Sequence, residues 1–305
     1  MLKIAALTTE SRNENSTTID KMSTGEILRT INDEDKTVAY SVEAVLPDIA
    51  ATVDIVHTSL LNGGRLFYVG AGTSGRLGIL DAVECPPTYS TPPELVQGIM
   101  AGGMIALVEA VEGAEDDTHQ GAKDLAEKKL TRLDVVVGIA ASGRTPYVIG
   151  VLQYAKKIGA KTISLSSNQD SMISKYADVV IDVATGPEVV TGSTRMKAAT
   201  AHKLILNMIT TSTMIKLGKV YENLMVDVNP SNVKLKERAK NIVSTITNES
   251  YERVEEVLEH SNFEVKPAIV MIKAGVNFET AKSCIQMSNG FVRNAIEIAK
   301  RGVLG

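Results

Sequence analysis

The sequence predicts an α/β fold in which a parallel sheet is flanked by helices, followed by a small helical region at the C-terminal end. Between residues 65 and 183, short apolar runs alternate with segments of helical periodicity. Strands that alternate with helices are typical of parallel sheets whose two faces are both covered by helices. From residue 229 onward, only helical patterns follow one another. This change of pattern predicts a separate helical part after the sheet.

Composition limits the class of protein. The chain has 305 residues, of which 44% are hydrophobic, and its formal net charge is −4. It carries no basic excess for nucleic acid, and its longest apolar runs fall short of the roughly 18 residues of a membrane span. Two cysteines make no disulfide framework, so we expect a cytoplasmic protein. The four histidines show no ligand spacing, and we expect neither a metal nor a cofactor.

The chain is predicted to have three parts. We expect an N-terminal extension with helices over 1–52, the α/β domain over 53–218 and the helical region over 219–305. Residues 1–22 are rich in Thr, Ser and Asn. This composition favours an irregular free tail, and a segment folded over a site is the alternative.

The individual elements follow from periodicity and from start and stop signals. The capping box S-x-x-E at 23–26 predicts the start of a helix, and a helical pattern over 39–61 is interrupted by Pro47 and ended by Asn62-Gly63-Gly64. The expected strands are 65–70, 98–103, 134–140, 161–167 and 178–183. The further expected helices are 74–83, 117–129, 147–158, 194–217, 233–247, 251–259, 266–274, 278–287 and 290–300.

The first expected strand opens into a glycine-rich turn, GAGTSG at 70–75. Such a turn before a helix presents backbone N–H groups and the positive end of the helix dipole to an anion. The same G-x-G-x-x-G pattern occurs in dinucleotide sites, but here the next strand ends without the carboxylate that binds a ribose. We therefore expect Gly72, Thr73 and Ser74 to bind a phosphate monoester, with an ordinary tight turn as the alternative.

Hydroxyl residues follow other expected strands as well. Ser142, Gly143 and Thr145 come after the third strand, and Ser166 lies at the end of the fourth. The carboxyl ends of parallel strands meet at one edge of the sheet, where ligands bind in open α/β folds. The shared pattern predicts a phosphorylated small molecule, although helix N-caps explain each loop singly. Ser193 lies in a similar stretch, TGSTRMK, which either caps the long helix or closes the site.

Two carboxylates are candidates for acid–base chemistry. Glu84 lies near the end of the helix that begins at the glycine-rich turn, and Glu115 belongs to the acidic run VEGAEDD. Most acidic runs are solvated surface or charges at a helix N-terminus, whereas a carboxylate beside a sugar-phosphate pocket provides a general acid or base. The residues alone leave both interpretations open.

Several stretches resemble known proteins. The paired loops GAGTSGR and ASGRTPY look like those of the sugar-isomerase (SIS) domain, a flavodoxin-like α/β fold that binds phosphosugars. LTTESRNENS, GAGTSGRLGILDAVECPPTY, GAEDD and TGSTRMKAATAHKLILNMITT together resemble the N-acetylmuramic acid 6-phosphate etherases. These stretches are spread over most of the chain. The resemblance makes the predicted α/β domain an SIS domain and the C-terminal part the small helical region of this family.

The resemblance also implies an activity. The family cleaves the D-lactyl ether of N-acetylmuramate 6-phosphate during cell-wall recycling, as a metal-independent lyase, and gives N-acetylglucosamine 6-phosphate and D-lactate. By position, the acid and base of the family fall on Glu84 and Glu115, with Glu84 at the leaving oxygen and Glu115 at C2. The implied partner is the phosphorylated amino sugar alone, with no nucleic acid and no membrane. A homodimer is expected from the family.

Other functions remain alternatives at this stage. A phosphosugar isomerase uses the same fold, and a non-catalytic phosphosugar sensor needs neither glutamate. A sensor that acts as a transcription factor carries a DNA-binding module, but no helix-turn-helix pattern with a basic face precedes residue 65. A dinucleotide oxidoreductase is the most distant alternative.

Overall fold

The computed structural model describes residues 7–228, 230 and 232–302. The chain forms two compact units. The first consists of Met1–Val83 with Pro93–Thr210, and the second of Glu84–Pro92 with Thr211–Gly305. Two long helices, α3 and α6, contribute residues to both units. The expected domain limits 53–218 and 219–305 stay predictions.

A five-stranded parallel sheet forms the centre of the first unit, as predicted. Its strand order is β2-β1-β3-β4-β5, so the chain crosses over between β2 and β3. All residues of β1 and β3 are buried, which explains why these strands are continuous apolar runs. The strands are β1 Leu66–Gly70, β2 Val96–Met100, β3 Val135–Ile139, β4 Lys161–Ser166 and β5 Val179–Asp182.

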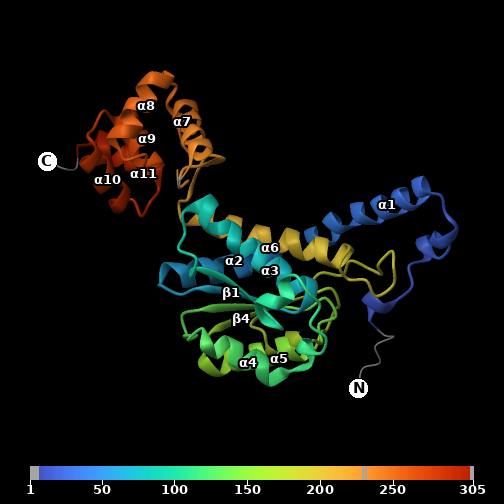
Figure 1. Cartoon of the computed structure of the whole chain (residues 1–305). Helices are drawn as coiled ribbons and strands as arrows, with labels where there is room; N and C mark the ends of the chain where they lie inside the picture. Colours follow the sequence, from blue (N-terminus) through green and yellow to red (C-terminus); the bar gives the residue numbers. More distant parts are fainter. Residues whose placement is uncertain (1–6, 229, 231, 303–305) are drawn as a thin grey trace. The chain divides into compact units, whose positions relative to one another are not determined.

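Helices cover both faces of this sheet. In Figure 1, α2, α3 and α6 lie on one face, and α4 and α5 lie on the other. The expected helix 74–83 is longer than predicted, because α3 continues through Pro86 and Pro87, whose fixed φ is compatible with a helix although each lacks an N–H donor. The helices on the two faces are α2 Leu46–Leu61, α3 Gly72–Tyr89, α4 Thr118–Glu127, α5 Pro146–Ile158 and α6 Lys197–Lys216.

Glycines allow α3 to lie unusually close to the sheet. A Cβ atom at Gly75 would approach the Cβ of Met100 to 2.5 Å, and one at Gly78 would approach the Cβ of Tyr68 to 2.8 Å. Both distances are shorter than van der Waals contact permits. The glycine-rich turn is therefore held directly over the carboxyl end of the sheet.

The N-terminal segment is not a free tail within the described residues, so that prediction is wrong for 7–22. Thr9 and Ser16 are buried. The Thr9 N–H donates to Asn168 Oδ1 at 3.4 Å, and Ser16 Oγ donates to the Val189 carbonyl at 2.7 Å. Hydrogen bonds to distant residues hold this polar segment in place, and composition does not reveal them. It forms three 3-10 turns, Thr8–Glu10, Glu14–Ser16 and Ile19–Lys21.

The first long helix, α1 Thr24–Glu43, begins at the predicted capping box of Ser23 and Glu26. The expected break falls between α1 and α2, and Pro47 occupies the first turn of α2, where its missing N–H costs nothing. In the described part of the chain, no single helix is long and apolar enough to cross a membrane. Taken together, α1 and α2 have the length and composition of a membrane span, but they are bent by 59° relative to each other.

The second unit contains the predicted C-terminal helices around their own apolar core. Val243, Val254, Leu258, Ile269 and Cys284 are among its buried residues. A short antiparallel hairpin precedes the helices and was not predicted; its turn places Glu222 at φ 53°. The elements are β6 Val220–Tyr221, β7 Leu224–Met225, α7 Val233–Thr247, α8 Tyr251–His260, α9 Val265–Ala274, α10 Phe278–Met287 and α11 Val292–Lys300.

Candidate active site

The loop after β1, residues 70–74, keeps its polar groups available. Gly72 has φ 53° and begins α3, so the turn uses the backbone conformation that glycine favours. Thr73 and Ser74 lie in the first turn of that helix. Neither hydroxyl has a hydrogen-bond partner among residues 7–228, 230 and 232–302. Two hydroxyl groups and the N–H groups of a helix start therefore lie in one turn, with the Ser74 side chain buried.

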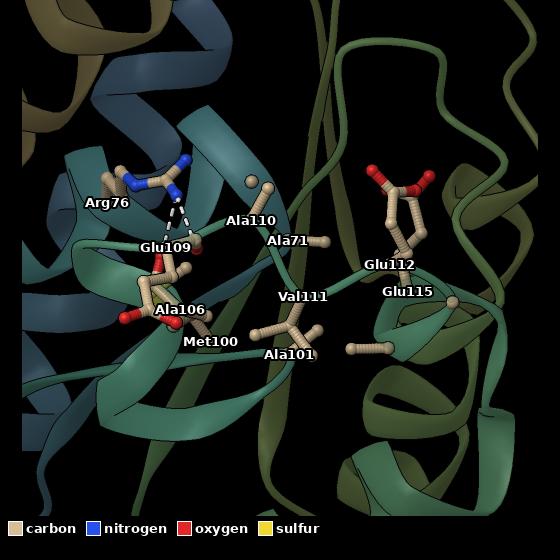
Figure 2. A pocket seen from close by; sticks show the side chains of 13 residues that line it. Ala71, Arg76, Met100, Ala101, Ala106, Glu109, Ala110, Val111, Glu112 and Glu115 are labelled. Atoms are coloured by element: carbon tan, nitrogen blue, oxygen red, sulfur yellow. Dashed lines mark hydrogen bonds between the residues drawn. The ribbon is translucent and has the colours of Figure 1, made fainter.

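Glu115 borders a pocket next to this loop. The pocket has a volume of about 140 Å³, and its lining includes Ala71 and Gly72 from the loop together with the whole segment 109–115. Glu115 is exposed, and so is Glu112, which lines the same pocket. Figure 2 shows these two side chains at one end of the pocket and Arg76 at the other. The structure thus brings Gly72 and Glu115 to the same pocket, whereas their roles stay predictions.

Arg76 holds the segment that carries the carboxylates. Its guanidinium donates to the Ala106 carbonyl at 2.7 Å and to the Glu109 carbonyl at 3.3 Å (Figure 2), and also to the Leu107 carbonyl at 3.1 Å. Three bonds from one planar group fix the backbone of a loop that has little regular structure. Sequence reasoning missed this role, although Arg76 ends the quoted motif GAGTSGR.

The loop after β3, residues 141–145, packs closely against the loop after β4. Gly143 has φ 68°, and a Cβ atom there would lie 2.2 Å from the Cβ of Ser171. The Gly143 carbonyl accepts the Ile173 N–H at 3.0 Å. Ser142 is half-buried and accepts only the Arg144 N–H at 3.3 Å. Within the described residues, the Thr145 side chain makes no capping bond before α5. Ser142 therefore retains its donor.

The loop after β4, residues 166–171, uses its hydroxyl groups internally. Ser166 is fully buried, and its Oγ lies 2.6 Å from the Asn168 carbonyl and 2.8 Å from Asp182 Oδ1. Burial raises the pKa of Asp182, and the Ser166 hydrogen bond opposes that shift. The sequence predicted that Ser166 lies at a strand end, but the Ser166 side chain faces Asp182 on the neighbouring strand β5.

Two further buried residues stabilise the same loop. His202 on α6 lies with its Nε2 3.1 Å from Ser167 Oγ, and burial lowers the pKa of His202 to about 4, so the ring is neutral at pH 7. Asn168 donates through Nδ2 to the Ala141 carbonyl at 2.9 Å and to Thr9 Oγ1 at 3.1 Å. Asn168 thereby connects this loop to the loop after β3 and to the N-terminal segment. Its place in the run SSN gave no signal for this, because both partners are distant in sequence.

The entry of α6 is already occupied by a protein carboxylate. Glu188 is fully buried and accepts the N–H groups of Lys197 at 2.8 Å and Ala198 at 3.0 Å. A carboxylate at this position satisfies the orphan donors of the helix and its dipole. Ser193 lies on the turn that precedes the helix, with its N–H bound to the Val190 carbonyl at 3.0 Å. The start of α6 is thus capped by Glu188, which lies outside the TGSTRMK stretch, and both roles considered for that stretch stay predictions.

Glu84 lies on α3, twelve positions after Gly72 in the sequence, and is exposed. It belongs to the second compact unit, whereas Gly72 and Glu115 belong to the first. Within the described residues, no group of three or more His, Cys, Asp or Glu side chains is arranged to hold a metal ion.

Comparison with known proteins decides the family. The chain matches the model of the glucokinase regulatory protein N-terminal SIS domain over residues 48–156 and that of the SIS domain over residues 110–212. An N-acetylmuramic acid 6-phosphate etherase from Bacillus subtilis (strain 168) is 57% identical over 296 residues, 97% of each chain. The chain belongs to the N-acetylmuramic acid 6-phosphate etherase family. An etherase from Clostridioides difficile (strain 630) is 52% identical over 95% of this chain and 96% of its own.

A solved structure agrees on the fold. Phosphoheptose isomerase from Neisseria gonorrhoeae aligns with a TM-score of 0.50 and 18% identity, covering 63% of this chain and 98% of its own. The aligned part of this chain thus shares its fold with that isomerase, and the predicted SIS fold with a C-terminal helical region is confirmed.

Proposed function

We propose that this chain is an etherase that cleaves the D-lactyl ether of N-acetylmuramate 6-phosphate and gives N-acetylglucosamine 6-phosphate and D-lactate. One observation carries the proposal: an exposed glutamate, Glu115, lines a pocket with the anion loop after β1, in a chain 57% identical to an etherase over nearly its whole length. The same site in an isomerase would also hold a phosphosugar, so the distinction rests on the family relationship. The alternatives of isomerase and sensor are not favoured.

The reaction is an elimination followed by a hydration. When the sugar ring opens, C1 becomes an aldehyde and the proton on C2 becomes acidic. Glu115 removes that proton, the C2–C3 double bond forms, and the C3–O bond to the lactyl group breaks as Glu84 protonates the leaving oxygen. Water then adds at C3, with its hydroxyl on C3 and a proton on C2. Two carboxylates in separate environments divide the acid and base roles.

The negative charges around this pocket favour binding of the substrate phosphate at a different place from the reacting carbons. Glu109, Glu112 and Glu115 border one small pocket, and their negative charges oppose a phosphate placed among them. The phosphate therefore belongs on the hydroxyl and N–H donors of Thr73, Ser74 and the 141–145 loop. Binding energy from this remote group positions C2 and C3 beside the carboxylate.

Finer parts of the proposal rest on the family resemblance. The enzyme is a carbon–oxygen lyase that acts in the cytoplasm, in peptidoglycan and amino-sugar recycling, and it works as a homodimer. Residues 53–218 form the phosphosugar-binding domain, and 219–305 form the helical region. Of the remaining predicted ligands, Gly143 shapes its loop, whereas Thr145, Ser166 and Ser193 are the weaker candidates for direct contact with substrate.

Isotope labelling tests the reaction. The protein is incubated with N-acetylmuramate 6-phosphate in water enriched in oxygen-18, and both products are analysed by mass spectrometry. Elimination and hydration place the label on C3 of the sugar and leave D-lactate unlabelled. Label in the lactate would mean attack at the lactyl carbon and would contradict the mechanism. Absence of lactate, with conversion of fructose 6-phosphate or glucosamine 6-phosphate instead, would favour an isomerase.

A further inference from the structure

The second unit contains a cavity outside the site described above. Its volume is about 800 Å³, and four lysines, Lys219, Lys236, Lys266 and Lys282, belong to its lining. A volume of this size accommodates a small molecule rather than a polymer. All lining residues belong to the second unit, among them Ser90, which follows α3.

The charges in this cavity do not balance. Asp227 Oδ2 lies 2.9 Å from Lys219 Nζ and 2.7 Å from Lys266 Nζ, so one carboxylate serves two ammonium groups. The Lys266 side chain is only 9% exposed. Burial lowers the pKa of Lys266, the Lys219 charge acts in the same direction, and Asp227 opposes both. An uncompensated cation in a partly buried cavity is costly unless a further anion is present.

A second surplus charge lies on the same cavity. Lys236 is placed over the Phe263 ring at 4.8 Å and has no carboxylate partner within the residues that the structure describes. Lys282 is paired with Glu264 at 3.1 Å, and both of these side chains are close to half exposed. The four lysines and two carboxylates thus leave two positive charges.

We propose that this cavity in the second unit, between Lys219, Lys236 and Lys266, binds the phosphate group of a small phosphorylated molecule. A phosphate monoester carries close to two negative charges at neutral pH and accepts several hydrogen bonds, which matches the surplus and the number of ammonium donors. Asn262 and Gln286 also line the cavity and offer neutral amide groups for hydroxyls on the rest of the ligand. The proposal is independent of the reaction proposed for the first unit.

Titration calorimetry on the full chain at low salt tests the proposal, because salt screens such contacts. Inorganic phosphate, N-acetylglucosamine 6-phosphate and unphosphorylated N-acetylglucosamine are the probes. The two phosphorylated probes should occupy two sites on each chain, and the neutral sugar should not occupy the lysine cavity. Equal affinity of both phosphorylated probes for this cavity identifies the phosphate group alone as the ligand, and tighter binding of the sugar phosphate identifies a phosphosugar. Either result supports the site.

Two substitutions separate the sites. Lys219→Met leaves Lys266 and Asp227 as a balanced pair, so the fold is retained, and Lys236→Met removes a cation from above a ring. Each should weaken phosphate binding in the cavity by about tenfold, the effect of one charge-assisted contact. Lys234→Met is the matched control, because Lys234 lies on the same helix as Lys236, α7, but lines a different pocket.

The outcomes are distinguishable. Phosphate binding that is unaffected by both Lys219→Met and Lys236→Met would overturn the proposal, as would binding that Lys234→Met weakens to the same extent. Ser142→Ala should weaken only the other site. If the first unit binds no phosphate, one site per chain remains, and both lysine substitutions should still weaken it.

Discussion

Two parts of the same sheet edge use similar residues in opposite ways. The loop after β1 begins a helix with hydroxyls that have no partner within the described residues, beside a pocket that contains an exposed glutamate. The loop after β4 also carries serines, but Ser166 is bound to Asp182 and Ser167 to His202. Only polar groups that the protein leaves unsatisfied are available for a ligand, because a satisfied group must first give up a hydrogen bond.

The same contrast appears at the two helix N-termini. The N-terminus of α3 is open beside Gly72, whereas that of α6 is filled by the buried carboxylate of Glu188. A helix start attracts one anion, and Glu188 already supplies it for α6. We therefore propose that the open loop and the loop after β3 bind the substrate, and that the loop after β4 and the start of α6 support them. The predictions below test this division.

The largest effect is expected at the proposed acid and base. Glu115→Gln and Glu84→Gln should each lower kcat for lactate release by roughly 10²- to 10⁴-fold, because each removes a proton-transfer group. Lactate is measured with a coupled assay, and folding is checked by circular dichroism. Asp116→Asn is the control, since Asp116 is a neighbour in the same acidic run that does not line the pocket. A rate within twofold of the unsubstituted protein for Glu115→Gln would remove it from the mechanism.

Two glycine substitutions compare the stability of the loop after β3, which packs tightly against the loop after β4, with that of the open loop after β1. Gly143→Ala combines φ 68° with a Cβ position 2.2 Å from the Cβ of Ser171, and it should cost about 3 kcal/mol of unfolding free energy. Gly72→Ala has φ 53° but nothing within 4 Å, so strain alone acts and the cost should be about 1 kcal/mol. Urea unfolding measures both. Equal costs would contradict the difference in packing.

The buried His202 makes the loop after β4 sensitive to acid. Burial lowers the pKa of His202 to about 4 in the folded state, whereas an unfolded histidine titrates near its usual value. The unfolded state therefore binds the proton first, and stability is lost as the pH falls from about 6.5 through 4. At pH 5 this residue should account for a loss of about 2 kcal/mol relative to pH 7.5.

His202→Gln isolates this contribution. Glutamine does not titrate, so the difference in unfolding free energy between the variant and the unsubstituted protein should shrink by that amount between pH 7.5 and pH 5. Urea unfolding at the two pH values measures it. A difference that is the same at both pH values would show that His202 is not buried as a neutral ring.

The smallest effects come from single serines, and they differ in kind. Ser142→Ala should raise KM about tenfold with little change in stability, since it removes a ligand donor. Ser166→Ala should lower stability by about 1 kcal/mol and leave KM nearly unchanged, because its hydroxyl is engaged with Asp182. Steady-state kinetics and urea unfolding on both variants give the four values. The reverse pattern would exchange the roles of the two loops.

The sequence predicted the sheet, the capping box at Ser23 and the helical region correctly, because apolar periodicity and local turn chemistry determine them. It did not distinguish Ser142 from Ser166, since both follow a buried strand. The difference depends on Asp182, which lies on a neighbouring strand, and side-chain partners of this kind leave no local pattern. For the same reason, the polar segment around Thr9 was predicted as a tail although Asn168 binds it.

The continuation of α3 through Pro86 and Pro87 shows another limit of prediction from sequence. Two consecutive prolines indicate a helix end, yet the helix reaches Tyr89. Glu84 therefore lies inside a helix rather than at its end. Its role as the acid still depends on the family resemblance, because no local pattern identifies it.

A crystal structure of the Glu115→Gln variant with N-acetylmuramate 6-phosphate tests the division between substrate-binding and supporting loops most directly, since slow turnover preserves the bound substrate. The account predicts the phosphate within hydrogen-bond distance of the Thr73, Ser74 and Ser142 hydroxyls, with C2 of the sugar next to the side chain at position 115. A phosphate bound instead by Ser166 or at the N-terminus of α6, with Glu188 displaced, would contradict it.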